Sequence, residues 1–451
     1  MFEKIEKILK ENNKILVSSS SYSSSELTNC SYVSEGLELY IANLQNSNII
    51  RQISFNPKVV ISLSTETEEL TYYGLAEIIK EPKEKEKVLK KLSKQDKLKP
   101  EGIFGVVLAK IKPVKIVVPE WNFNEKISEN EPPIVKEVFQ SFSRTVKIWM
   151  EAVRLPFVSV SVGAVLVGAA VAFFEHGIFN WSRFFLTFFG IGIFHVSADL
   201  FNDFFDHILG SDEINVKRTP FSGGSRFIQN KLFTPTRVLV GAIVSLLACI
   251  AIGFYLNFGV QGTGVAGNVI IYIGLAGAFM GVFYVGLPFK IVHYGLGELA
   301  IFLSFGPAIV FGSYYVQAEQ FSWAPIAASV LIGLLISLIL FINQFPDHDS
   351  DKASGKKHWV VRLGLKKSTY IYIGFMSLVY VLLIIFAATQ ILPPLTLIAL
   401  LSLIFSIKAM VTARKHYDNY LAMIPAQAMT ILTCLAFSIL LSIALFISYL
   451  F

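Results

Sequence analysis

Apolar residues fill most of the chain from residue 154 onward, in long runs separated by short polar stretches. The runs lie near 155–174, 184–205, 237–257, 268–288, 295–316, 324–345, 369–389, 393–412 and 420–449. Each has the length of roughly 20 residues that a helix needs to cross the hydrocarbon core of a bilayer. The pattern therefore predicts an all-α polytopic membrane bundle of about nine transmembrane helices.

Residues 1–125 follow a different pattern. An amphipathic segment with Ile5, Ile8 and Leu9 on one face precedes strand-like runs that are rich in β-branched and aromatic residues. These runs are KILVSSSS, LELYIAN, VVISLST, LTYYGLAEII and KIKPVKIVV. A lysine- and glutamate-rich segment at 80–99 predicts a solvated helix between two of the strands. We expect a small soluble α+β domain here.

A linker is expected at residues 126–148. It contains Pro132-Pro133, and the stretch VKEVFQSFSRTVKIW predicts an amphipathic helix that lies at the membrane surface. The membrane domain then occupies residues 149–451.

Composition supports a membrane protein. Hydrophobic residues make up 53% of the chain and charged residues 16%, with a mean hydropathy of +0.57. The net charge of +6 is modest and agrees better with basic loops than with a nucleic-acid surface, so we expect no nucleic-acid partner. Cys30, Cys249 and Cys434 are far apart in the sequence, which argues against a zinc site or a disulfide framework.

Loop charge predicts the orientation. Alternate loops contain fourteen basic residues, whereas the loops of the other side contain one, Arg183. The positive-inside rule makes the basic side cytoplasmic. The start of the chain is too charged for a secretory signal peptide. We therefore expect a multi-pass protein of the plasma membrane with a cytoplasmic N-terminal domain.

Two acidic clusters at helix ends are the candidate site. Asp199, Asn202, Asp203 and Asp206 fall at i, i+3, i+4 and i+7 on the second predicted membrane helix. The sixth helix ends in a similar pattern, Asn343-x-x-x-Asp347-x-x-x-Asp351, within which Pro346 predicts a kink or a helix end. Ionisable groups in membrane helices are costly, so such clusters indicate function.

Facing sets of oxygen ligands favour Mg²⁺, which binds a few carboxylates and completes its octahedron with phosphate and water. The expected ligand is a diphosphate. Basic residues that follow the clusters could bind phosphate oxygens. These residues are Lys217, Arg218, Arg226, Lys352, Lys356, Lys357 and Arg362. The alternative is that they only follow the positive-inside rule. For Arg226, inside FSGGSR, we favour a functional role, because the glycines permit a close backbone approach to a ligand.

Four segments together resemble a known family. NDFFDHILGSD, KRTPFSGGSRFIQ, YVGLPFK followed by YGLGELAIFLSFGP, and NQFPDHDSDKASGKKHWVVRLG are similar to the UbiA superfamily of intramembrane prenyltransferases. Within it they look most like the 1,4-dihydroxy-2-naphthoate polyprenyltransferases of menaquinone biosynthesis. The resemblance implies Mg²⁺-dependent transfer from a polyprenyl diphosphate to an aromatic acceptor. Alternative acceptors are 4-hydroxybenzoate and geranylgeranylglyceryl phosphate.

The resemblance also implies residue roles. The metal positions match Asn202, Asp206, Asp212, Asn343, Asp347 and Asp351. The diphosphate would be bound by Lys217, Arg218, Arg226, Lys352, Lys356 and Arg362. Catalytic roles fall to Asp203, Arg226, Tyr284 and Lys290. For Asp199 and Asp203, support of the metal ligands and binding of the aromatic substrate both remain open. His195 is interpreted as a packed polar residue rather than a base.

The N-terminal domain resembles a second family. Its order of a helix, strands, NIIRQISFNPKVVISLST and YYGLAEIIKEP is similar to the FMN-binding split barrels related to pyridoxamine phosphate oxidase. That resemblance implies FMN, with Arg51 and the serine run beginning at Ser18 as phosphate-binding candidates. The alternative is a cofactor-free barrel that acts as a docking or regulatory module.

An ion-coupled transporter is the competing function of another class, because carriers also combine membrane carboxylates, broken helices and pseudo-repeats. Carrier sites lie near the bilayer midplane, whereas these acids gather at one edge beside many cations. An enzyme is therefore favoured. The sequence does not indicate the oligomeric state or the prenyl chain length.

Overall fold

A computed structural model describes most of the chain. The described residues are 1–12, 14–20, 25–44, 47–65, 67–94, 106–127, 142–143, 146, 149–150, 154–215, 217, 219–222, 224–258 and 268–451. The chain divides into two compact units, one formed by residues 1–149 with 227–234 and the other by residues 150–226 with 235–451. Most of the expected linker at 126–148 lies outside the described residues.

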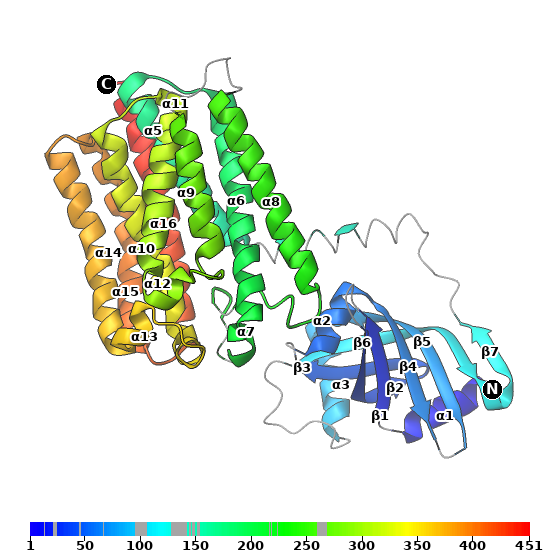
Figure 1. Cartoon of the computed structure of the whole chain (residues 1–451). Helices are drawn as coiled ribbons and strands as arrows, with labels where there is room; N and C mark the ends of the chain where they lie inside the picture. Colours follow the sequence, from blue (N-terminus) through cyan, green and yellow to red (C-terminus); the bar gives the residue numbers. More distant parts are fainter. Residues whose placement is uncertain are drawn as a thin grey trace. The chain divides into compact units, whose positions relative to one another are not determined.

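The first unit is an antiparallel β-barrel (Figure 1). Its strands are β1 (Lys14–Ser20), β2 (Ser25–Glu35), β3 (Glu38–Leu44), β4 (Lys58–Ser64), β5 (Glu69–Ile78), β6 (Val106–Val118) and β7 (Phe123–Lys126). They pair in the order β3-β2-β1-β4-β5-β6-β7, and an additional β3–β6 pairing closes the first six into a barrel. The helices of this unit are α1 (Phe2–Glu11), α2 (Asn48–Phe55) and α3 (Pro82–Lys94).

The barrel core follows from alternation along the strands. In β4 every second residue, Val59, Ile61 and Leu63, is buried, as expected for a strand with one face toward a core. The apolar face of α1 is buried in the same core. The small split-barrel-like domain predicted from the sequence is confirmed.

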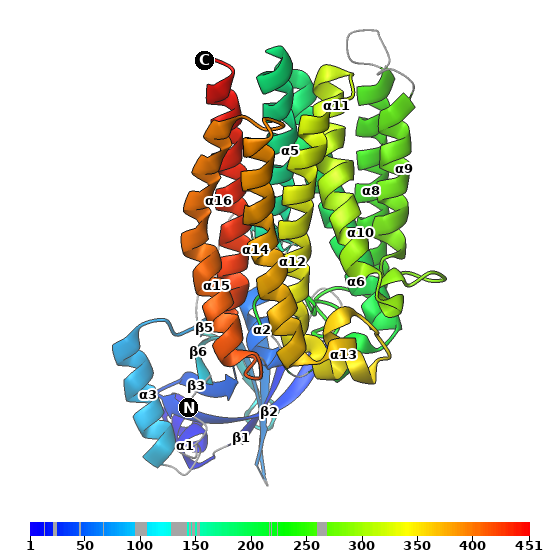
Figure 2. The ribbon, with the colours of Figure 1, turned by 90° about the vertical axis from the view of Figure 1, so that its left-hand side faces the viewer.

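The second unit is a helical bundle (Figure 2). Its long helices are α5 (Leu155–His176), α6 (Trp181–Ile208), α8 (Pro235–Phe258), α9 (Val269–Phe283), α12 (Trp323–Ala353), α14 (Leu365–Ala388), α15 (Leu403–His416) and α16 (Ile424–Ser448). Shorter helices are α7 (Ser211–Ile214), α10 (Gly297–Leu303), α11 (Gly312–Ala318) and α13 (Trp359–Leu363). A π-helical segment, Ser304–Phe311, joins α10 to α11, and a 3₁₀ segment, Pro394–Ser402, precedes α15.

Among the described residues, eight helical spans are long and apolar enough to cross a membrane. All nine predicted runs are helical, but the fourth one forms only α9, which has 15 residues and ends at Phe283 rather than near residue 288. The chain turns after Phe283 because Gly286 favours turns and Pro288 disfavours the α-conformation of the residue before it. The predicted membrane bundle is confirmed, with eight long spans rather than nine.

The expectation for Pro346 needs a correction. It predicted a kink or an end of the sixth helix. The end is wrong, because α12 continues through Pro346 to Ala353, and the kink stays a prediction. Because α12 packs against α5, α10, α14 and α16, its tertiary contacts support a helix that local preference alone would end. The second acidic cluster therefore lies on one continuous helix.

A π-helical segment forms around Pro307. Proline has no N–H to donate, so the regular i→i−4 pattern cannot continue through it, and a π-helical turn accommodates the interruption. Ser304, Phe305 and Ala308 of this segment line the main cavity of the bundle.

Candidate active site

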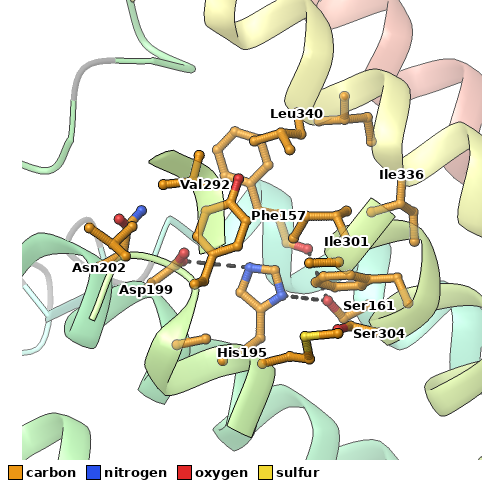
Figure 3. Close-up of a pocket in the computed structure, with 18 of the residues that line it drawn as sticks. Phe157, Ser161, His195, Asp199, Asn202, Val292, Ile301, Ser304, Ile336 and Leu340 are labelled. Atoms are coloured by element: carbon orange, nitrogen blue, oxygen red, sulfur yellow. Dashed lines mark hydrogen bonds and ion pairs between the residues drawn. The ribbon is translucent and has the colours of Figure 1, made fainter. Parts of the chain in front are cut away.

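The bundle encloses a cavity of about 330 Å³ lined by residues of α5, α6, α9, α10, α12 and the π-helical segment. Its polar residues come mainly from the second half of α6 and the end of α12. Apolar side chains such as Phe157, Ile301, Ile336 and Leu340 form other parts of the wall (Figure 3). The cavity therefore has a polar part and an apolar part that can receive a hydrocarbon.

The first acidic cluster is placed by the helical repeat of α6. Asp199, Asn202 and Asp206 line the cavity, as their spacing on one helix face predicts. Asp206 accepts a hydrogen bond from Ser211 Oγ at 3.1 Å. Asn202 Oδ1 is buried and has no hydrogen-bond partner within the described residues. A buried amide oxygen of this kind is costly unless a ligand occupies it.

Asp203 has a different environment. It is absent from the cavity wall, and its Oδ1 lies 2.6 Å from Arg154 Nη2. Its carboxylate also accepts hydrogen bonds from the backbone N–H and the hydroxyl of Ser225. Asp203 thus ties α6 to the start of α5 and to the loop that follows α7, which is a positioning role.

The second acidic cluster reaches the same cavity from α12. Asn343, Asp347 and Asp351 all line it. Asn343 Oδ1 accepts from Gln427 Nε2 at 3.0 Å, and Asp347 Oδ1 accepts from Asn215 Nδ2 at 2.8 Å. The fold therefore brings together two clusters that are more than a hundred residues apart in the sequence.

Lys356 links the two clusters. Its Nζ lies 3.0 Å from Asp206 Oδ1 and 3.3 Å from Asp351 Oδ1. Burial by itself lowers the pKa of Lys356, but the charges of Asp206 and Asp351 outweigh burial, and the net pKa is raised. Asp351 also contacts the buried His358 through Oδ2, at 3.0 Å from Nε2. A fixed positive charge therefore stands between the carboxylates.

The side chains of the two acidic clusters could bind Mg²⁺ if the substrate supplied further ligands. Carboxylate and amide oxygens are hard ligands of the kind that Mg²⁺ prefers. Within the described residues, however, no three carboxylate, histidine or cysteine side chains form a preformed metal site. The residues Asn202, Asp206, Asp347 and Asp351 therefore fit a metal that obtains its remaining ligands from phosphate and water.

The predicted basic residues separate into two groups. Lys356 lines the cavity. Lys352 and Arg362 are exposed and do not line it, and Arg362 donates to the Tyr294 carbonyl at 2.7 Å. Lys217 is half-exposed and forms an ion pair with Asp349 at 2.6 Å. Arg226 does not line the cavity either, so four of the six predicted phosphate ligands lie outside the cavity wall.

Three further predicted residues lie in the segment after α6. Arg226 has a left-handed backbone, with φ of 60°, and donates from Nη2 to the Asn215 carbonyl, so it holds the loop whose Asn215 contacts Asp347. Arg218 lies outside the described residues, and so does the side chain of Asp212.

Tyr284 and Lys290 are placed differently from each other. Tyr284 lines the cavity with a buried hydroxyl that has no partner within the described residues. Burial raises the pKa of this hydroxyl, so it stays protonated and available as a donor. Lys290 does not line the cavity.

The structure adds residues that the sequence did not single out as site residues. Arg154, Ser161, Ser211, Gln344 and His358 line the cavity. Gln344 directly follows Asn343, and its amide nitrogen and oxygen are both buried without a partner within the described residues. Only the helical neighbourhood of the second cluster could have indicated Gln344; the others require knowledge of which segments meet.

The candidate FMN-binding residues of the barrel lie on α2 and β1. Arg51 is half-buried on α2. The buried hydroxyl of Ser19 donates to Gln52 Oε1 at 2.6 Å, and Ser20 Oγ accepts from Asn56 Nδ2 at 2.9 Å. These two hydroxyls already have protein partners, so FMN binding stays a prediction.

Known proteins resemble the chain in the region of this cavity. The model of the UbiA prenyltransferase family matches residues 161–424. A 2-carboxy-1,4-naphthoquinone phytyltransferase of Synechocystis sp. is 29% identical over 280 residues, which are 61% of this chain and 85% of that protein. The chloroplastic 2-carboxy-1,4-naphthoquinone phytyltransferase of Arabidopsis thaliana is 30% identical over 291 residues, 62% and 72% of the two chains. A 1,4-dihydroxy-2-naphthoate octaprenyltransferase of Mycobacterium tuberculosis is 27% identical over 237 residues, 52% and 76% of the two.

Solved structures resemble each unit at low identity. A digeranylgeranylglyceryl phosphate synthase aligns over 67% of this chain and 98% of its own, with 16% identity and a TM-score of 0.42. A Listeria innocua protein described as a pyridoxamine 5′-phosphate oxidase aligns over 26% of this chain and 96% of its own, with 22% identity and a TM-score of 0.24.

Proposed function

The chain belongs to the UbiA prenyltransferase family, and we propose that it transfers a polyprenyl group to 1,4-dihydroxy-2-naphthoate in a Mg²⁺-dependent reaction. The observation that carries the proposal is Lys356, which stands between Asp206 and Asp351 within one largely apolar cavity. A cation flanked by carboxylates from two helices suits a diphosphate with its metal. The product would serve menaquinone biosynthesis.

The residues of the chain would divide the work as follows. Bound Mg²⁺ would supply neutralisation of the diphosphate leaving group, held by Asn202, Asp206, Asp347 and Asp351. Lys356 would bind a diphosphate oxygen directly as a fixed cation. The apolar wall would hold the isoprenoid chain and keep water from the allylic cation.

The acceptor is proposed from the relatives. Several relatives are named as naphthoate or naphthoquinone prenyltransferases. An aromatic acceptor has an apolar ring and polar substituents, so a cavity with an apolar wall and a few unpartnered polar groups is suitable. The competing acceptors, 4-hydroxybenzoate and geranylgeranylglyceryl phosphate, are distinguished by assay.

The direct test is an assay of the purified full chain in detergent with Mg²⁺, a polyprenyl diphosphate and each acceptor, with products identified by mass. We expect a prenylated naphthoate product and released diphosphate. Asp206→Ala and Asp347→Ala should each lower the rate at least about 100-fold, because each removes charge stabilisation of the leaving group. Full activity in both variants, or turnover without Mg²⁺, would contradict the metal-dependent mechanism.

The transporter alternative is not supported. The chain is a prenyltransferase by family, and its named relatives are transferases. It is an integral membrane protein by the eight apolar spans found in the described part of the chain. We further propose location in the plasma membrane, a cytoplasmic barrel and FMN in that barrel. A purified chain that has no flavin absorbance and takes up no FMN on reconstitution would exclude the flavin proposal.

A further inference from the structure

We propose that Asp199, oriented by His195 and Ser161, is the base that takes the hydroxyl proton of the aromatic acceptor, an inference that rests on the proposed function. Asp199 lines the cavity on α6, one turn deeper in the helix than Asn202. It is therefore close to the diphosphate site but separate from the carboxylates that Lys356 neutralises.

Asp199 is part of a connected polar row. Its Oδ2 lies 3.6 Å from His195 Nε2, and His195 Nδ1 lies 2.5 Å from Ser161 Oγ (Figure 3). The Ser161 hydroxyl has two acceptors within reach, His195 Nδ1 and the Phe157 carbonyl at 3.5 Å. We assign its hydrogen to Nδ1, which puts the imidazole proton on Nε2, facing the carboxylate. The row starts on α5 and ends in the cavity wall, so it holds the carboxylate in one orientation.

The carboxylate is incompletely satisfied. Oδ2 is buried and has no hydrogen-bond donor within 3.5 Å in the described part of the chain. The side chain is 16% exposed, and because Asp199 lines the cavity, this exposed part faces it. A carboxylate within a membrane helix is costly and is retained where it has a task. An uncharged hydroxyl group that donates a hydrogen bond would stabilise it.

The charge pattern argues against the diphosphate and for an uncharged hydroxyl group of the acceptor at this carboxylate. A diphosphate is anionic and would be repelled by a carboxylate that has no ammonium against it. Asp206 and Asp351 have such an ammonium in Lys356. Asp199 has an imidazole at 3.6 Å and the more distant guanidinium of Arg154, which is itself paired with Asp203. A hydroxyl group fits Asp199 because it donates a hydrogen bond and becomes more acidic as negative charge leaves the ring during attack.

Gln344 supplies a second contact for the same molecule. Gln344 lines the cavity, and its amide nitrogen and oxygen are buried and have no partner within the described residues. A buried amide can both donate to and accept from a polar substituent of an aromatic ring. The acceptor would thus be bound through one hydroxyl at Asp199 and one further polar group at Gln344.

The proposed step balances as follows. The acceptor O–H bond breaks, its proton moves to the carboxylate of Asp199, and the electron pair stays on the acceptor oxygen. A ring carbon bonds to the allylic carbon as the bond from that carbon to the diphosphate breaks, and the diphosphate leaves with the electron pair. The attacked carbon then loses a proton to water or its carboxyl group as CO₂. The proton on Asp199 returns to the acceptor oxygen.

The test separates acceptor activation from ionisation of the donor. Two rates are measured for each variant of the full chain with Mg²⁺, namely prenyl transfer to the acceptor and slow diphosphate release without acceptor. In Asp199→Asn we expect transfer to fall by at least about 100-fold, the lower range for loss of a general base. Diphosphate release should stay within about twofold of wild type, since the diphosphate site is intact.

An acceptor series gives a second readout. Naphthols with more acidic hydroxyls need less help from a base, so they should recover much of the lost rate in Asp199→Asn. His195→Gln should lower kcat and show the same dependence on hydroxyl acidity, which a merely structural defect would not produce. Gln344→Leu should raise KM for the acceptor with little change in kcat. Ser197→Ala, whose hydroxyl bonds the Ala242 carbonyl away from the cavity, is the control on α6.

The outcomes are distinguishable. Equal loss of transfer and of diphosphate release in Asp199→Asn would place this residue at the metal site and overturn the inference. Wild-type transfer by Asp199→Asn, or a rate independent of acceptor acidity, would also overturn it. If the wild-type chain releases diphosphate but modifies no hydroxyl-bearing aromatic compound, the proposed function fails, and the inference fails with it.

Discussion

At the scale of single residues, the sequence placed some residues in the cavity wall correctly and misplaced others for one reason. Residues whose spacing follows a helix repeat, such as Asn202, Asp206 and Asp347, line the cavity as predicted. Asp203 is on the same helix but contacts Arg154 and Ser225, which come from distant segments. Loop contacts of that kind depend on tertiary packing, which a helix repeat does not contain.

Lys356 allows a prediction at this scale. Lys356→Met keeps an unbranched side chain that is one atom shorter and removes its charge, which leaves Asp206 and Asp351 facing each other without a cation. The loss of a charged hydrogen bond costs about 1.5–3 kcal/mol, so KM for the polyprenyl diphosphate should rise about 10- to 100-fold. Steady-state kinetics with varied diphosphate measures this.

The neighbouring Lys357 is the matched control. It is exposed and does not line the cavity, so Lys357→Met should change KM by less than about twofold, as surface substitutions have small effects. An unchanged KM in Lys356→Met would show that its ammonium does not bind the diphosphate.

At the scale of helices, hydropathy predicted which segments are helical better than it predicted where each helix ends. All nine apolar runs became helical, since runs of this length must satisfy their backbone internally in a bilayer. Local signals were misleading where packing intervenes. Pro346 is accommodated inside α12, whereas Pro307 coincides with a π-helical turn. The same residue type thus gave two results, and the sequence around it does not distinguish them.

Gly168 provides a prediction about helix packing. A Cβ on this residue of α5 would lie 2.2 Å from the Val310 carbonyl oxygen in the π-helical segment. Gly168→Ala should therefore push the two apart and cost about 1–3 kcal/mol, as overpacking does. The change is measured as a lower midpoint of thermal unfolding in detergent.

Gly374→Ala on α14 is the control for this substitution. Nothing lies within 4 Å of the Cβ it would add, so the variant should be as stable as wild type or gain up to about 1 kcal/mol from helix propensity. Equal midpoints for both variants would refute the close contact between α5 and the π-helical segment.

At the scale of the whole molecule, the two-unit organisation follows from composition because a barrel core and a lipid-facing bundle need different patterns. The sequence alone allowed the proposal that the two acidic clusters meet, since they are alike and both end long apolar helices. The contacts that complete the cavity could not be proposed from the sequence. In the sequence, nothing distinguishes Gln344 and the residues Ser161, His195 and Asp199 from other polar residues. Their contacts form only when α5, α6 and α12 pack together.

Orientation in the membrane is the remaining whole-molecule property that can be tested. The proposed cytoplasmic side is where loop cations gather, and α14 has Lys366 and Lys367 at its first turn and no basic residue in its last. In a chain whose three cysteines are replaced, Lys366→Cys and Gln390→Cys place one thiol at each end of α14. Both positions are exposed. A membrane-impermeant maleimide added to intact cells should label Gln390→Cys and should label Lys366→Cys only after the membrane is opened. The reverse pattern would put the acidic clusters and Lys356 on the outer side, away from the soluble precursors that the proposed reaction needs.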